Sequence, residues 1–251
     1  MPKDCHPITL GADLCCDSAH KTLPVLTGGA YLHVGKAAPD LLASQAERAL
    51  ALFASTSPSY LILQSLDVAN RYLAGEYRER LSSMIVQLQK IKENLSAHGY
   101  PIIGNEPGKL TIAPKAYGYT GDQLHDCLRK QGMECEFSDP DFLVMMPTPA
   151  LDAEELERTE NILLGIPRRA AMEETLPALP HPQRAMSIRQ AMLSLQEQVS
   201  VEDALGRILA DAHVGCPPCI PVVMAGEWID EAAIRCFRYY GIDSCGVVLE
   251  K

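Results

Sequence analysis

The stretch of sequence that decides the fold is Asp17-Ser18-Ala19-His20-Lys21-Thr22-Leu23-Pro24. An apolar run at residues 8–16 precedes it and is typical of a short buried strand that ends at Asp17. A second strand-like run follows at residues 28–34 and begins with a pair of glycines. The pattern therefore predicts two strands joined by a tight turn that carries Lys21.

A second compound motif lies near the other end of the sequence. It reads Pro217-Pro218-Cys219-Ile220-Pro221 and is followed by Gly226-Glu227. Because Glu227 comes just before the polar and apolar residues of 228–231, we predict that it is a carboxylate at the start of a helix.

The two motifs together resemble those of the bacterial ornithine/lysine/arginine decarboxylases. These are pyridoxal-phosphate (PLP) enzymes of the aminotransferase-like fold. The family's second motif is Pro-Pro-Gly-Ile-Pro…Pro-Gly-Glu, and this chain departs from it at Cys219 and Ala225. The resemblance covers nearly the whole chain, and two motifs in the family's order are much more specific than either one alone.

The resemblance implies roles for five residues. Lys21 would hold PLP covalently through its amine and later take part in proton transfer. Ser18 would donate a hydrogen bond to the cofactor phosphate, or alternatively cap the end of the strand. His20 would lie near the phosphate and the substrate, or alternatively serve a structural role. Ser55 and Thr56 resemble a loop that reaches the phosphate of a neighbouring subunit, and they also suit N-capping of the next helix.

The implied fold is α/β and has three parts. A partial aminotransferase-like PLP large domain with its interdomain helix occupies residues 1–98, and a small α/β domain occupies residues 99–167. A linker at residues 168–185 leads to a C-terminal α+β decarboxylase domain at residues 186–251.

Hydrophobic periodicity predicts the elements of this layout. A helix runs from Asp40 to Phe53, and a long helical stretch at residues 59–97 is expected to bend near Gly75 and end at His98-Gly99. The next part has the predicted order β-α-β-β-α. Its strands are expected at residues 109–113, 135–137 and 142–146, and its helices at residues 120–131 and 151–166.

The family places further cofactor contacts upstream of the lysine. They are an aspartate on the ring nitrogen, an aromatic or histidine stacked on the ring, and a Gly/Ser-rich phosphate loop. Only twenty residues precede Lys21, and Asp4-Cys5-His6 has the wrong spacing for the family's Asp-x-x-His-Gly segment. The sequence thus resembles the C-terminal portion of a decarboxylase. We expect an apolar face and unpaired strand edges, and hence poor solubility or obligate assembly of the chain alone.

The composition limits which binding partners and which cellular compartment we expect for this protein. The net charge of −10 and the pI near 5.2 argue against nucleic acid and anionic membranes. Apolar runs are too short to span a membrane and the start lacks a signal-peptide core, so we expect a cytoplasmic protein. Nine cysteines then indicate reduced thiols, with Cys15 and Cys16 as small buried hydrophobes. The expected partners are a basic amino-acid substrate and either a homo-oligomer or an N-terminal half-chain.

Three functional hypotheses follow. The leading one is PLP-dependent decarboxylation of arginine, lysine or ornithine to the amine and CO2, completed by a separate N-terminal half. The alternative is a non-catalytic remnant or assembly module of such a decarboxylase. A third is a thiol-disulfide protein that uses Cys216 and Cys219. No second Cys-x-x-Cys or histidine pair accompanies these cysteines, so the sequence predicts no metal site.

Overall fold

The computed structural model describes residues 6–211, 215–216 and 220–249. They form two compact units. Unit 1 comprises Met1–Thr111, Gln131–Glu136 and Val144–Pro167, and unit 2 comprises Ile112–Lys130, Phe137–Leu143 and Arg168–Lys251. The three-part domain division at residues 1–98, 99–167 and 186–251 remains a prediction.

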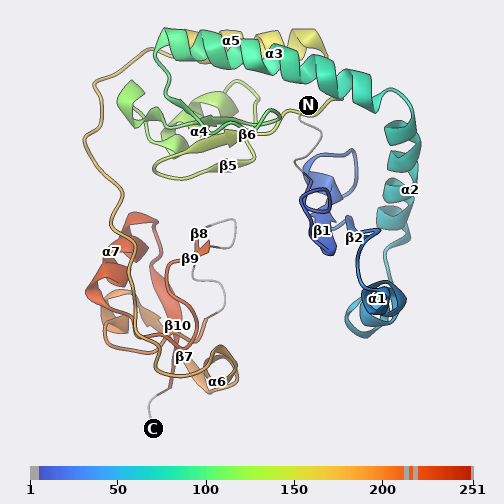
Figure 1. Ribbon diagram of the computed structural model, residues 1–251. Helices are drawn as coiled ribbons and strands as arrows, with labels where there is room; N and C mark the ends of the chain where they lie inside the picture. The colour runs from blue at the N-terminus through green and yellow to red at the C-terminus, as the bar shows by residue number, and fades with distance from the viewer. Residues whose placement is uncertain (1–5, 212–214, 217–219, 250–251) are drawn as a thin grey trace. The chain divides into compact units, whose positions relative to one another are not determined.

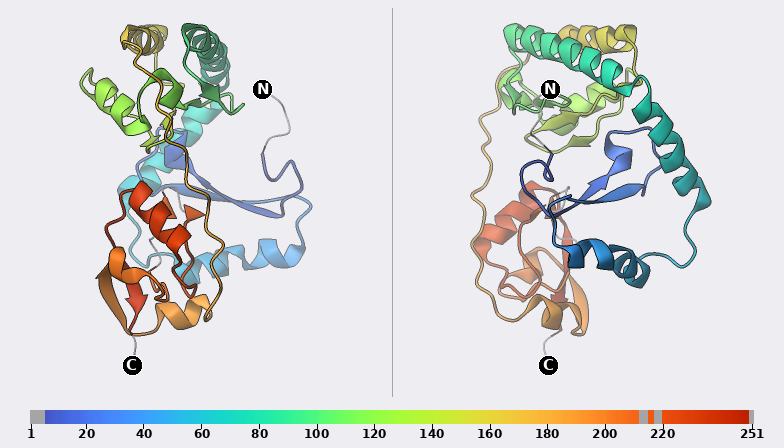
Figure 2. Two further views of the ribbon diagram at one scale, coloured as in Figure 1. Left: turned by 90° about the vertical axis from the view of Figure 1, so that its left-hand side faces the viewer. Right: turned by 45° about the vertical axis from the view of Figure 1, so that its right-hand side comes forward.

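The lysine turn joins two antiparallel strands of unit 1, β1 (Leu14–Ser18) and β2 (Ala30–Val34), which form a two-stranded ribbon (Figure 2). The predicted strand–turn–strand layout is confirmed, but the first strand begins later, because residues 7–11 form turns. The predicted burial is wrong, since β1 is exposed or half-buried along its length and Cys16 is exposed. No other described strand pairs with the ribbon, so both strands keep an unpaired edge.

Two helices follow the ribbon, α1 (Asp40–Phe53) and α2 (Tyr60–Ala74). Hydrogen bonds tie α2 to the lysine-turn region, since the Tyr31 hydroxyl donates to the Leu66 carbonyl at 3.1 Å. None of the 14 residues of α1 is buried, and its Phe53 is 90% exposed. The apolar face expected from the sequence is therefore present on unit 1. Other large apolar side chains exposed in this region are Leu14, Leu32, Leu41, Leu50 and Leu52.

The predicted long helix is two helices, α2 and α3 (Tyr77–His98), separated at Gly75. The predicted glycine cap is confirmed, because Gly99 ends α3 in the left-handed conformation, with φ of 107°. α3 lies alongside α5 (Ala153–Gly165) in unit 1 (Figure 1). A buried stripe at helical spacing makes the contact, with Met84, Leu88, Ile91 and Leu95 from α3 and Leu156 and Leu163 from α5.

A four-stranded sheet follows. Its strands, in spatial order, are β3 (Ile102–Ile103), β4 (Leu110–Ile112), β6 (Leu143–Met145) and β5 (Phe137–Ser138). The predicted order β-α-β-β-α is present, with β3 as an additional short strand at its start. Both helices begin with a capping box, at Thr120 for α4 (Gly121–Arg129) and at Asp152 for α5. A short 3-10 helix, η2 (Pro114–Tyr117), lies between β4 and α4 in the sequence.

The C-terminal part of unit 2 packs α7 (Glu231–Tyr239) against an antiparallel pair, β7 (Gln196–Ser200) and β10 (Ser244–Val248) (Figure 1). Phe237 and Val247 are fully buried in the shared core. The remaining elements are α6 (Ile188–Met192), η3 (Glu202–Ala204), β8 (Gly215–Cys216) and β9 (Ile220–Pro221). Residues 168–183 form no helix or strand, and the linker at residues 168–185 stays a prediction.

The helix-start role predicted for Glu227 is wrong. Asp230 caps α7, since its Oδ1 accepts a hydrogen bond from the Ala233 N–H at 2.7 Å. Glu227 instead closes a turn, where its Oε2 accepts from the Met224 N–H at 2.8 Å. The residues Pro217, Pro218 and Cys219 of the same motif lie outside the described residues, so the Cys216–Cys219 hypothesis stays a prediction.

A buried ion pair holds unit 2 together. The Lys115 amine lies 2.9 Å from Oδ1 of Asp141, and the two side chains are only 13% and 4% exposed. The Tyr239 hydroxyl of α7 donates to the same oxygen at 2.7 Å, and the Lys115 amine also contacts that hydroxyl. The other carboxylate oxygen of Asp141 is buried without a hydrogen-bond partner among the described atoms. In the part of the chain that the structure describes, no helix has the length and apolar character to cross a membrane.

Candidate functional site

Lys21 is the last residue of η1 (Ala19–Lys21), and hydrogen bonds to the Gly29 carbonyl hold this short 3-10 turn. The Ala19 N–H and the Nδ1–H of His20 both donate to the Gly29 carbonyl, at 2.9 and 3.2 Å. A Cβ atom at Gly29 would lie 2.4 Å from a methyl group of Val25, so the approach of the turn to this carbonyl requires glycine. The sequence thus sets the direction in which Lys21 leaves the turn.

The Lys21 side chain is 48% exposed, and its amine forms an ion pair with the carboxylate of Glu136. It also lines a cavity of about 580 Å³ in unit 1. The other polar lining residues are His6, Asp17, Ser18, Thr22, Tyr31, His33 and Asn70. The lining of the cavity therefore combines an amine, a carboxylate, hydroxyls and two imidazoles.

The structure brings together two of the five predicted site residues, Lys21 and Ser18, on the lining of this cavity. The capping alternative for Ser18 is wrong, because its side chain makes no capping hydrogen bond to η1. His20 is half-buried and bonded to the Gly29 carbonyl, which is the structural role. It does not line the cavity.

The other two predicted residues, Ser55 and Thr56, are exposed and do not line the cavity. Their capping alternative is wrong, because Ser59 caps α2 by accepting from the Ile62 N–H at 3.5 Å. The Ser55 hydroxyl accepts from the Ser57 N–H at 3.0 Å in the loop that precedes the helix. Contact between this loop and a cofactor in a neighbouring subunit stays a prediction.

The sequence interpretation missed a polar cluster on the cavity wall. Oδ2 of Asp17 lies 3.0 Å from Nε2 of His6 and 3.2 Å from Nε2 of His33. The Cys15 thiol donates to the other oxygen of Asp17 at 3.0 Å. This hydrogen bond and then that of His6 lower the pKa of the Asp17 carboxyl, and the same bond raises the pKa of the Cys15 thiol. The alternation of side chains along two paired strands could have indicated this cluster, but only if the register of the two strands is known.

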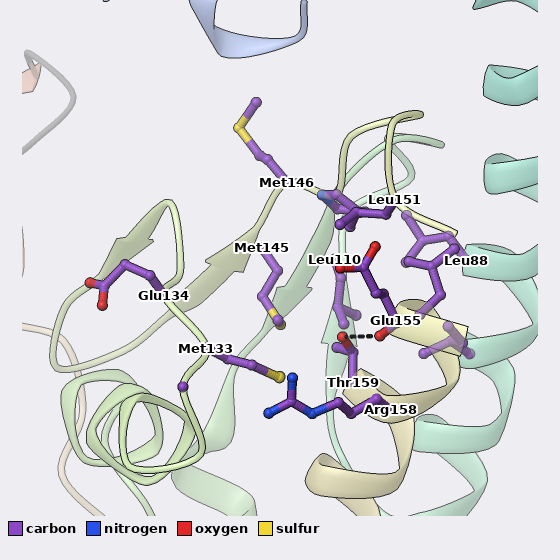
Figure 3. Close-up of a pocket in the computed structure, with 14 residues that line it drawn as sticks. Leu88, Leu110, Met133, Glu134, Met145, Met146, Leu151, Glu155, Arg158 and Thr159 are labelled. Carbon is purple, nitrogen blue, oxygen red and sulfur yellow. Dashed lines mark hydrogen bonds between the residues drawn. The ribbon is translucent and has the colours of Figure 1, made fainter. Parts of the chain in front are cut away.

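A second, separate cavity of about 260 Å³ lies between α3, α5 and the loop that contains Met133 (Figure 3). Met133 and Met145 supply apolar lining, and the Arg158 guanidinium donates to the Gln131 carbonyl at 2.8 Å. The Thr159 hydroxyl donates to the Glu155 carbonyl at 2.9 Å. This cavity contains none of the predicted site residues, so the chemistry expected from the sequence belongs to the Lys21 cavity.

Solved structures of lysine decarboxylases share the fold. Lysine decarboxylase A from Pseudomonas aeruginosa superposes with a TM-score of 0.74 at 15% identity, covering 94% of this chain and 49% of that one. The lysine decarboxylase of Francisella novicida gives 0.72 at 16% identity, with 93% and 48% coverage. The chain thus has the α/β fold of these lysine decarboxylases, over about half of their length.

The chain belongs to the Orn/Lys/Arg decarboxylase family. The major-domain family matches residues 1–155, and the C-terminal-domain family matches residues 169–242. An arginine decarboxylase of Bacillus subtilis is 30% identical over 245 residues, which cover 89% of this chain and 49% of that protein. An uncharacterized protein of the same organism is 30% identical over 251 residues, with 91% and 50% coverage. The chain spans about half the length of the curated relatives it matches.

Proposed function

We propose that this chain supplies the lysine-bearing part of a PLP-dependent decarboxylase of a basic amino acid. Arginine, lysine or ornithine would lose CO2 and give a polyamine-type amine, in the cytoplasm. A separate N-terminal half-chain would complete the site, within a homo-oligomer. The observation that carries the proposal is the position of Lys21, on a turn fixed by Gly29 and at the wall of a cavity.

The residues of the cavity fit the side of PLP that this chain would hold. Lys21 supplies the amine for covalent attachment, and the hydroxyl of Ser18 is free of any capping bond and can donate to the phosphate. When bound, PLP supplies an electron sink for the electrons that remain as CO2 departs. Ser55 and Thr56 would reach the phosphate held by a neighbouring subunit.

The described lining of the cavity holds no arginine and no lysine other than Lys21. A dianionic phosphate and a ring nitrogen need further charged and hydrogen-bonding partners. We therefore assign these contacts to the N-terminal half-chain. Within this chain, Lys21 must leave Glu136 before its amine can react with an aldehyde and move a proton.

The test is covalent trapping. The purified chain is incubated with PLP, reduced with borohydride and mapped by mass spectrometry, both alone and with a separately encoded N-terminal half. Stoichiometric labelling of Lys21, lost in Lys21→Arg and kept in Lys36→Arg, supports the proposal. Weak labelling spread over surface lysines under both conditions contradicts it. Release of CO2 from the three basic amino acids would then identify the substrate.

A second candidate is a non-catalytic remnant or assembly module. The ion pair of Lys21 with Glu136 and the 48% exposure of its side chain favour this candidate. A lysine reacts best with PLP where its surroundings keep water and carboxylates away from the amine, because the neutral amine is the reactive form. Under this second reading the apolar face of α1 would serve subunit contacts, and the trapping experiment would leave Lys21 unlabelled.

A further inference from the structure

His6, Asp17 and His33 direct three metal-ligating atoms at one point. Nε2 of His6 lies 3.0 Å and Nε2 of His33 lies 3.2 Å from the same oxygen, Oδ2 of Asp17. The three ligand atoms all lie within 4.8 Å of one another. The strand register explains part of this convergence. Because Asp17 pairs with Tyr31 and Cys15 pairs with His33, Asp17 and His33 are diagonal neighbours on one face of the ribbon.

The two imidazole–carboxylate distances are close to the ligand spacing in a metal coordination sphere. At zinc–ligand distances of about 2.0–2.2 Å and tetrahedral angles, two ligand atoms are about 3.3–3.5 Å apart. The observed separations of 3.0 and 3.2 Å therefore need to widen by only a few tenths of an ångström. The two imidazole rings meet edge to face, with centroids 5.4 Å apart.

The charge and exposure of the cluster suit a cation. The carboxylate of Asp17 is the acidic group of the cluster and would supply the negative charge that attracts a cation. Cys15 occupies Oδ1 at 3.0 Å, which leaves Oδ2 to the two imidazoles. The three side chains are 41–45% exposed, so an ion can reach them from solvent.

One hydrogen bond opposes metal binding by His6. Its Nδ1 accepts from the Ile8 N–H at 3.2 Å, whereas an imidazole that binds a metal through Nε2 carries its proton on Nδ1. Binding therefore requires Ile8 to release this bond. His6 would be the last of the three ligands to engage, and its engagement would fix the turn at residues 6–11 to the ribbon.

We propose that His6, Asp17 and His33 form a binding site for one divalent cation of the zinc class, with open coordination positions towards the cavity that Lys21 lines. Neutral imidazole and carboxylate form a common ligand set for such ions. The distances that support the site involve neither Lys21 nor PLP, so they do not rest on the proposed decarboxylase function. Sequence alone predicts no metal site here because the three residues follow no ligand-spacing motif.

The test uses the full chain, treated with a chelator and kept reduced, and titrated with Co²⁺ while visible absorption is recorded. Co²⁺ distinguishes the ligands, because thiolates add an intense charge-transfer band that imidazole and carboxylate lack. Competition with Zn²⁺ then gives the zinc affinity. The variants are His33→Ala, Asp17→Asn and His6→Ala, with His181→Ala, an exposed histidine of unit 2, as the matched control.

The expected result is one Co²⁺ per chain without a thiolate band, displaced by Zn²⁺. Each of the three substitutions should weaken binding by at least about tenfold, and His181→Ala should leave it unchanged. His6 precedes β1, so its variant removes a ligand that lies outside the strands of the ribbon. No saturable binding, binding only with a thiolate band, or equal affinity in the variants and the control would overturn the proposal.

Discussion

The Lys21 amine is paired with the carboxylate of Glu136, a residue 115 positions further along the chain. Both residues belong to unit 1. The pair connects the lysine turn to the segment that leads into β5, and it occupies the group that the proposed chemistry requires. Whether Lys21 can react therefore depends on how easily this pair opens.

Replacing Glu136 with glutamine is expected to increase the labelling of Lys21 by PLP and borohydride. The two side chains are 48% and 33% exposed, and pairs of this kind contribute about 0.2–1 kcal/mol, which corresponds to at most about fivefold in labelling. Peptide mapping at equal PLP concentration measures the change. Glu134→Gln, two residues away, is the control. Equal labelling in all three proteins would mean that Glu136 does not restrain the amine.

Gly29→Ala is expected to destabilise unit 1 by about 1–3 kcal/mol, because the added methyl group would overlap Val25 at 2.4 Å. The same shift should weaken the hydrogen bond from Ala19 and lower the yield of label at Lys21. Denaturant unfolding measures the first effect and peptide mapping the second. Gly108→Ala, where a Cβ meets no atom within 4 Å, should behave like the unsubstituted chain. Wild-type stability in Gly29→Ala would show that the turn tolerates a side chain.

Lys115→Met is expected to destabilise unit 2 by about 3–5 kcal/mol. The substitution leaves the Asp141 carboxylate, which is 4% exposed, without its charged partner. Urea denaturation measures the loss of stability. Lys109→Met removes an exposed pair with Glu106 and should cost at most about 1 kcal/mol. A similar small loss in both variants would contradict the importance of the buried pair.

The contribution of Lys115 should depend on pH in the alkaline range. Burial acts to lower the pKa of its amine, but hydrogen bonds to Tyr239 and Asp141 outweigh burial and raise the pKa above 10.5. The folded state therefore holds this proton more tightly, so the stabilisation is complete below pH 10.5 and is lost as the pH rises through the folded pKa. The difference in unfolding free energy between wild type and Lys115→Met should shrink above pH 10.5. A difference that is constant with pH would contradict this.

The sequence predicts local features well. The lysine turn and the glycine cap of α3 depend on residues that lie within a few positions of one another. Choosing between nearby carboxylates is harder. Glu227 and Asp230 both suit a helix start, and only the position of the Ala233 N–H decides for Asp230.

Long-range relationships could not be predicted in the same way. The pairing of Lys21 with Glu136 joins distant segments, and the convergence of His6 and His33 on Asp17 depends on the register of β1 and β2. The exposure of β1 has a different cause. An apolar strand predicts burial, but burial also requires a complete covering layer, and β1 stays exposed or half-buried in a ribbon that no other described strand extends.

Because helix α1 is exposed or half-buried along its whole length, its helical content should depend on whether another surface binds to it. It has 14 residues, none of them buried, whereas isolated helices of about this length are only marginally stable in water. Its helicity is therefore coupled to whatever surface covers Leu50 and Phe53. Binding at this face would order the backbone as well as bury side chains. The circular dichroism of the chain would then vary with concentration and with added half-chain, so that helix content becomes a direct reporter of assembly.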